Sequence, residues 1–162
     1  MSLGDPGAAL EALERSDAIL TRLGERSSRS TTQAFLAQAH WRLGSVDAAW
    51  AALELAEELG GTEDVGTMIE THRVRAQMAL ASGDGEAAER WARSAVEYAF
   101  ATDALVDQAD SKLTLARVLA GLERPQEAVA EARAALELFL TRGDRPGANR
   151  TRALLDELGD RE

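Results

Sequence analysis

The sequence predicts an all-α protein built as an α-solenoid of helical hairpins, and three observations support this prediction. Alanine recurs at positions 9, 49, 88 and 128, at almost equal spacing and each time just after a helix break. Aromatic residues make up only 4% of the 162 residues, which suits closely packed helices better than a β-rich core. Between the breaks, apolar residues follow helical spacing. A period of about 40 residues is typical of stacked helix pairs.

The first predicted element is a half repeat over residues 5–24. Asp5 and Pro6 are typical of a helix N-cap followed by a first-turn proline, and Gly24 is typical of a helix stop. Because Ala9 aligns with Ala49, this helix has the phase of a second helix in a hairpin. We therefore expect the chain to be a piece of a longer protein.

Three full repeats are predicted to follow, over residues 29–61, 62–101 and 102–143. Each contains a break between its two helices, at residues 43–47, 82–86 and 122–126. The first helices are expected near 30–43, 63–82 and 103–121, and the second helices near 46–59, 85–100 and 125–142. Gly60-Gly61 and Gly143 are the expected stops.

A capping helix is predicted over residues 144–159. Asp144-Arg145-Pro146 starts it, and its apolar stripe consists of Ala153, Leu154 and Leu158. An open solenoid end needs such a helix, because one of its faces must be polar toward water. In total we expect about eight helices in a single helical-repeat domain over residues 1–162.

The composition narrows the possible partners. The chain is 45% hydrophobic and 28% charged, which is typical of a folded soluble protein, and no apolar run approaches the roughly 20 residues that span a bilayer. Its formal net charge is −10, whereas nucleic acids and anionic membranes require clustered cations. There is no cysteine, so disulfide and thiolate chemistry are excluded. We expect a cytoplasmic protein that binds neither nucleic acid nor membrane directly.

Small residues at matching positions give a family resemblance. Ala76, Ala88 and Ala95 fall where the tetratricopeptide repeat has small residues, and Gly83-Asp84 falls where that family has its turn. The chain therefore resembles that family. It departs from it in a longer period and in the residues that stand where an aromatic is usual, which are His40, Ala79 and Leu119. The resemblance implies superhelical hairpins with longer helices.

A second resemblance covers residues 92–158. It is carried by ADSKLTLARVL at 109–119, RPQEA at 124–128 and GDRPGA at 143–148. These strings are similar to the C-terminal helical repeats of bacterial class III adenylate or guanylate cyclases with an ATPase module, and of LuxR-type regulators. The resemblance implies a regulatory, protein-binding region in a signalling protein. It implies no cyclase or ATPase chemistry within this chain.

Motifs for catalysis or cofactor binding are weak. Residues 83–88 fit the dinucleotide fingerprint G-x-G-x-x-A, but the preceding segment is predicted to be a helix where the fingerprint requires a strand, so we interpret them as a repeat turn. His40 and His72 have no second ligand at metal-binding spacing and are expected to pack between helices. We therefore predict no catalytic residue, no cofactor and no metal, and hence no enzyme.

A concave groove is the candidate binding surface. Trp50 and Trp91 are expected in the core, whereas Trp41 falls at a position that commonly lines such a groove, where tryptophan favours peptide binding. Arginines on this surface could hold a carboxylate by bidentate contacts, although a merely solvated face is the alternative. The predicted groove residues are Gln38, Trp41, Arg42, Glu70, Arg73, Gln77, Asp110, Leu113 and Arg117.

The sequence favours a non-enzymatic module that binds a protein or peptide, which could be a domain of the same parent chain. Two alternatives remain open. One is a repeat domain that senses a peptide or small molecule in an apolar pocket. The other is a homo-oligomerisation module that forms a homodimer through the leading half repeat, where Leu10, Leu13 and Leu20 would lack their normal cover.

Overall fold

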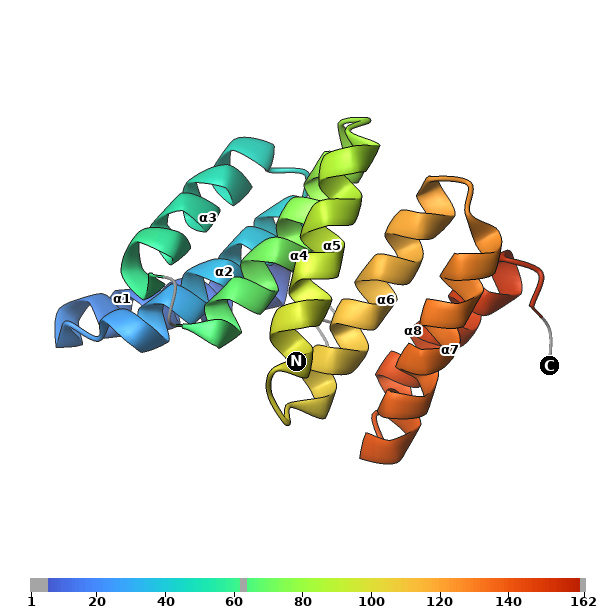
Figure 1. Cartoon of the computed structure of the whole chain (residues 1–162). Coiled ribbons are helices and arrows are strands. Elements are labelled where there is room, and N and C mark those ends of the chain that lie inside the picture. The colour runs from blue at the N-terminus through green and yellow to red at the C-terminus, as the bar shows by residue number, and fades with distance from the viewer. Residues whose placement is uncertain (1–5, 62–63, 161–162) are drawn as a thin grey trace. The chain divides into compact units, whose positions relative to one another are not determined.

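The computed structural model describes residues 6–61 and 64–160, and these form eight α-helices without a strand (Figure 1). The predicted all-α class and the predicted number of helices are confirmed. In chain order the helices are α1 (Pro6–Leu23), α2 (Arg26–Arg42), α3 (Val46–Gly60), α4 (Val65–Ala81), α5 (Gly85–Phe100), α6 (Leu105–Gly121), α7 (Pro125–Arg142) and α8 (Arg145–Glu157). The predicted N-cap Asp5 lies outside the described residues.

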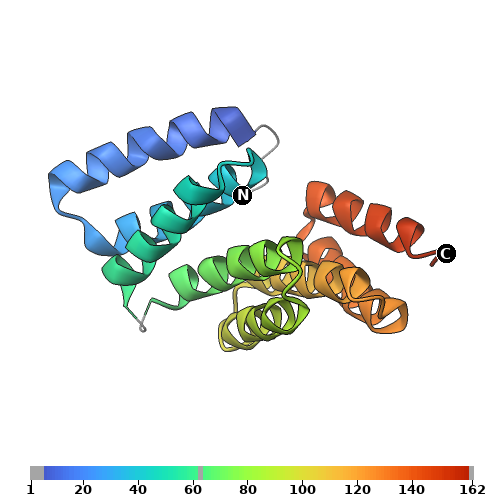
Figure 2. The same ribbon diagram turned by 90° about the horizontal axis from the view of Figure 1, so that it is seen from above.

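The chain divides into two compact units, Met1–Val74 and Arg75–Glu162, with the division falling within α4. In the first unit α1 packs against α2, and α2 packs against α3. In the second unit α5, α6, α7 and α8 pack in chain order, and α8 also touches α6. Figure 2 shows this succession within each unit. Within each unit, helices that follow one another in the sequence therefore pack together, as predicted for helical hairpins.

The sequence period is also a period of packing. Residues 88–100 of α5 and 128–140 of α7 have the same order of buried, half-buried and exposed positions. Four positions in each helix are completely buried, and they are Ala88, Ala92, Ala95 and Ala99 in α5 and Ala128, Ala132, Ala135 and Phe139 in α7. Small side chains at these positions let neighbouring helices approach closely. Two hairpins that differ in sequence therefore bury the same face.

Phe139 replaces alanine at one of these buried positions, and Gly147 makes room for it. A Cβ atom added to Gly147 would clash with three carbon atoms of the Phe139 side chain. The aromatic ring is thus accommodated by the absence of a side chain on α8. The large and the small residue together fill the contact between α7 and α8.

A hydroxyl side chain recurs at one buried position of the three first helices, α2, α4 and α6, and of the capping helix α8. Thr32, Thr71, Ser111 and Thr151 follow one another at the period of the repeat, and each is at most 8% exposed. The three threonines donate to the carbonyl oxygen four positions earlier, over 2.8, 3.0 and 2.9 Å in that order. The hydroxyl of Ser111 has no hydrogen-bond partner. The helix backbone therefore satisfies most of these buried hydroxyls.

The helix boundaries follow the predicted breaks with one difference. α2 begins at Arg26, whereas the sequence predicted a start near residue 30. The serines and threonines here are typical of loops, yet in α2 the hydroxyls of Ser30 and Thr32 bond to backbone carbonyl oxygens of the same helix, those of Ser27 and Ser28, over 2.6 and 2.8 Å. A short connection after Gly24 is enough to reverse the chain.

The outer face of α8 is polar, which confirms the predicted capping helix. In α6, the positions that pack inside the second unit are the buried residues Ala109, Leu113 and Ala116. The residues one period later, in α8, are exposed, and they are Asn149, Ala153 and Asp156. Polar residues at two of these three positions, and a small alanine at the third, close the hydrophobic core toward water.

Candidate protein-binding surface

The predicted groove residues all lie on the first helices of the hairpins, namely α2, α4 and α6. Within the first unit, Gln38 and Glu70 are buried, with 3% and 5% exposure. Trp41 is half-buried and Arg42 is exposed. Only part of the predicted set in this unit is therefore accessible to a partner.

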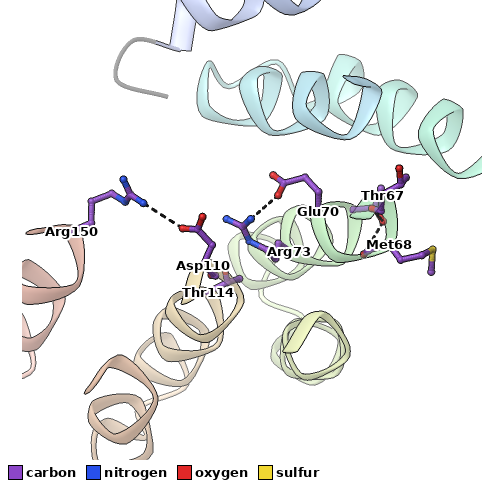
Figure 3. A network of polar contacts seen from close by, with 8 residues as sticks. Thr67, Met68, Glu70, Arg73, Asp110, Thr114 and Arg150 are labelled. Atoms are coloured by element: carbon purple, nitrogen blue, oxygen red, sulfur yellow. Dashed lines mark hydrogen bonds and ion pairs between the residues drawn. The ribbon is translucent and has the colours of Figure 1, made fainter. Parts of the chain in front are cut away.

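Arg73 was expected to hold a carboxylate of a partner, but it binds a carboxylate of its own helix. Its Nη1 donates to Oε2 of Glu70 over 2.6 Å, and the two side chains are 13% and 6% exposed (Figure 3). A pair so well shielded from water interacts strongly, and separating it would leave two charges poorly solvated. The pair makes Arg73 a poor contact for a foreign carboxylate.

In the second unit, Asp110 of α6 is in register with Glu70 of α4, and it pairs with the capping helix α8. Nη2 of Arg150 on α8 lies 3.3 Å from Oδ1 of Asp110 (Figure 3). The guanidinium of Arg150 also lies over the ring of Phe139, 5.8 Å from its centroid. These two contacts orient the Arg150 side chain on the face formed by α6 and α8.

An open cavity of about 460 Å³ lies on this face. Its lining combines two arginines with two alanines, one leucine and one carboxylate, and consists of Arg117, Ala120, Arg150, Ala153, Leu154 and Glu157. Arg117 is exposed and was among the predicted groove residues. Arg150 was missing from the predicted set, although the repeat register that links it to Asp110 would have indicated it. The size is that of a ligand site for a small segment.

Two other expectations need correction. Leu113 is 2% exposed and belongs to the apolar core of the second unit with Ala109 and Ala116, so it does not line a surface. Within the first unit, the residues in register with Glu70 and Arg73 are Thr31 and Ala34, one period earlier. Trp41 and Arg42 therefore do not hold the positions in α2 that those two residues hold in α4.

The tryptophans of the second helices also differ from expectation. Trp50 was predicted to be core, yet it is 41% exposed at the start of α3. Trp91 is half-buried, and the guanidinium of Arg75 lies 5.3 Å from its ring centroid. The position of each tryptophan along its helix did not predict its exposure, because exposure depends on which side chains of other turns or helices lie against the indole ring.

The dinucleotide-like string is a helix-capping turn, as predicted. α4 precedes it where the fingerprint needs a strand, and Gly83 has a φ of +84°. The Asp84 carboxylate accepts from the backbone N–H of Ala87 over 2.9 Å. That N–H is one of the groups that a phosphate would need at the helix N-terminus.

The two histidines lie apart from any visible ligand set. His40 is half-buried and His72 is 5% exposed. Within residues 6–61 and 64–160, no three histidine, cysteine or acidic side chains are grouped so that they could hold a metal ion. None of the helices in this part of the chain has the length and apolar character needed to cross a membrane.

Comparison with known proteins gives no assignment. No protein-family model matches the sequence, and no curated protein was found to be related to it.

Proposed function

We propose that this chain is a non-enzymatic, tetratricopeptide-like module that binds a protein segment carrying a carboxylate, on the face formed by α6 and α8. The observation that supports the proposal is the cavity between these helices, with Arg117 and Arg150 in its lining. In the larger context, the module would regulate a bacterial signalling protein, as the sequence resemblance to cyclase-ATPase and LuxR-type regulators implies.

The chemistry of the cavity favours an acidic segment with small apolar side chains. A guanidinium presents its donors in a fork that matches the two oxygens of a carboxylate. Arg150 is held in place by Asp110, so little side-chain entropy is lost when it binds. Ala120 and Ala153 leave space for a small side chain next to the carboxylate. Glu157, also in the lining, would repel a segment with several adjacent acids.

Binding can be tested with a fluorescein-labelled synthetic peptide of glutamate, alanine and leucine that ends in a free carboxylate. We expect fluorescence anisotropy to show saturable, salt-sensitive binding that is lost when the peptide is amidated and its glutamates are replaced by glutamines. Arg117→Ala should weaken binding by about tenfold or more, because it removes a charge-assisted hydrogen bond.

The matched control is Arg90→Ala. Arg90 is a surface arginine of α5 that pairs with Glu86 at 2.8 Å and lies outside the cavity lining. This variant should bind the peptide like the unaltered protein. Equal loss in both variants would mean that the peptide responds to overall charge, and unchanged binding in Arg117→Ala would refute the proposed site.

A further inference from the structure

The helix α1 has the sequence pattern of a second helix, but it is less covered than the others. α1 (Pro6–Leu23) and α7 (Pro125–Arg142) are both 18 residues long and both begin with proline. The four completely buried positions of α7 correspond in α1 to residues that are only half-buried, which are Ala9, Leu13, Ser16 and Leu20. α1 therefore retains apolar surface that α7 buries.

The exposed side of α1 carries one continuous stripe. Ile19 and Leu23 are 49% and 70% exposed, and they follow Ala8, Ala12 and Arg15 at steps of three or four positions. Residues at these steps share one face of a helix. The stripe has two small residues in its N-terminal half and two large apolar residues in its C-terminal half.

We propose that this stripe binds the same stripe of a second copy, with the two α1 helices antiparallel. In that arrangement Ala8 lies opposite Leu23 of the second copy, and Ala12 lies opposite Ile19 of the second copy, because both pairs are symmetric about the same point of the helix. Small residues then face large ones, so the side chains can interdigitate. Arg15 lies next to the two-fold axis.

Charge along the helix supports the antiparallel orientation. Glu11 and Arg22 flank the stripe on the same side, and antiparallel pairing brings Glu11 of one copy near Arg22 of the other. The present ion pair of Glu11 with Arg15 is loose, at 3.9 Å with both side chains at least 70% exposed. It can therefore be exchanged at little cost.

The opposite end of the chain does not offer α1 an equivalent partner. The α8 residues in register with the buried Ala109 and Ala116 of α6 are Asn149 and Asp156. A helix docked there would have to remove their polar groups from water. Pairing of α1 with itself avoids that cost and closes after two copies, as isologous interfaces do. A single pair of helices buries little area, so we expect a weak dimer.

The oligomeric state tests the proposal directly. Sedimentation equilibrium over about 5 to 500 µM should show a monomer–dimer equilibrium, in the weak range expected of a small interface. Ile19→Glu with Leu23→Glu should give a monomer with unchanged helix content. The control is Leu43→Glu with Val46→Glu, which charges two apolar residues of similar exposure outside α1 and should leave the dimer intact. A monomer at all concentrations would overturn the proposal.

Because the chain has no cysteine, single introduced cysteines can report the orientation. Under mild oxidation Arg15→Cys should crosslink two copies, since position 15 meets itself near the two-fold axis. Leu23→Cys should not crosslink with itself, whereas the double variant Ala8→Cys with Leu23→Cys should. Crosslinking of Leu23→Cys alone would indicate parallel helices and refute the antiparallel arrangement. Peptide binding by the α6–α8 cavity is measured separately, so either proposal can fail without the other.

Discussion

At the scale of single residues, the three turns inside the hairpins show how one conformation is reached by different side chains. Gly44, Gly83 and Glu123 occupy equivalent positions of successive repeats, and all have positive φ, at +75°, +84° and +58°. Glycine adopts this left-handed conformation without strain, whereas a residue with a Cβ atom does not. Among the described residues, Glu123 is the non-glycine residue with positive φ.

Replacing Glu123 by glycine should therefore stabilise the protein. We expect Glu123→Gly to raise the free energy of unfolding by about 0.5–1 kcal/mol, measured by urea denaturation, because the native φ no longer carries a steric cost. The control Glu54→Gly, at an exposed position inside α3, should lower it by about 1 kcal/mol. Destabilisation by Glu123→Gly would show that the glutamate side chain stabilises the fold by more than the left-handed backbone conformation destabilises it.

At the scale of elements, an arginine joins two second helices. Arg124, the N-cap residue of α7, binds Glu127 in the first turn of α7 at 2.6 Å and Glu89 of α5 at 2.7 Å. Arg124 donates hydrogen bonds that hold the pKa of Glu127 and of Glu89 below their usual value, and Arg93 adds to the effect on Glu89. The two carboxylates in turn raise the pKa of Arg124. This cluster links successive hairpins on the surface.

The lowered pKa values give a pH dependence. A carboxyl group whose pKa is lower in the folded state stabilises the fold above its unfolded pKa, and this contribution is lost as the pH falls through the folded pKa. We therefore expect the melting temperature to decrease when the pH is lowered below about 5, because this range is set by the ordinary pKa of glutamate. Arg124→Gln should lower the melting temperature at pH 7 and reduce this acid-dependent loss.

The control for Arg124→Gln is Arg90→Gln, which removes an isolated, exposed pair on one helix. It should change the melting temperature and its pH dependence less, since such pairs contribute little. High salt, about 1 M, should reduce the effect of Arg124→Gln because the cluster lies at the surface. Equal pH profiles for the unaltered protein and Arg124→Gln would contradict the assigned role.

At the scale of the whole molecule, each of the two compact units has its own buried leucines. Leu53 is completely buried in the first unit, and Leu115 is 2% exposed in the second. In repeat proteins, stability is a sum over local units and their neighbours rather than a single global quantity. A change in one core is therefore expected to be felt mainly in its own unit.

Leu53→Ala should lower the free energy of unfolding of the first unit by about 2–5 kcal/mol, because it leaves a cavity among tightly packed helices. Hydrogen–deuterium exchange should then become faster in α2 and α3 and change little in α7 and α8. Leu115→Ala is the matched variant and should give the reverse pattern. Faster exchange throughout the chain in either variant would mean that the two units unfold as one.

Some of the candidate surface could be predicted from the sequence and some could not. Arg117 was predicted on the groove and does line the cavity. Arg150 and Glu157 were missed because α8 was interpreted only as a cap. Their contribution depends on α8 lying beside α6, which the pattern within α8 does not show.

The sequence by itself determined the helices, the breaks between them and the period of the repeat. These features depend on local chemistry, such as helical spacing of apolar residues, alanine at close contacts and glycine at left-handed turns. Only the tertiary structure decided that the pair of Glu70 and Arg73 is shielded from water, that Leu113 is buried and that Trp50 is exposed. Such outcomes depend on which atoms of other turns or helices lie against a side chain, and a one-dimensional pattern does not specify those distances.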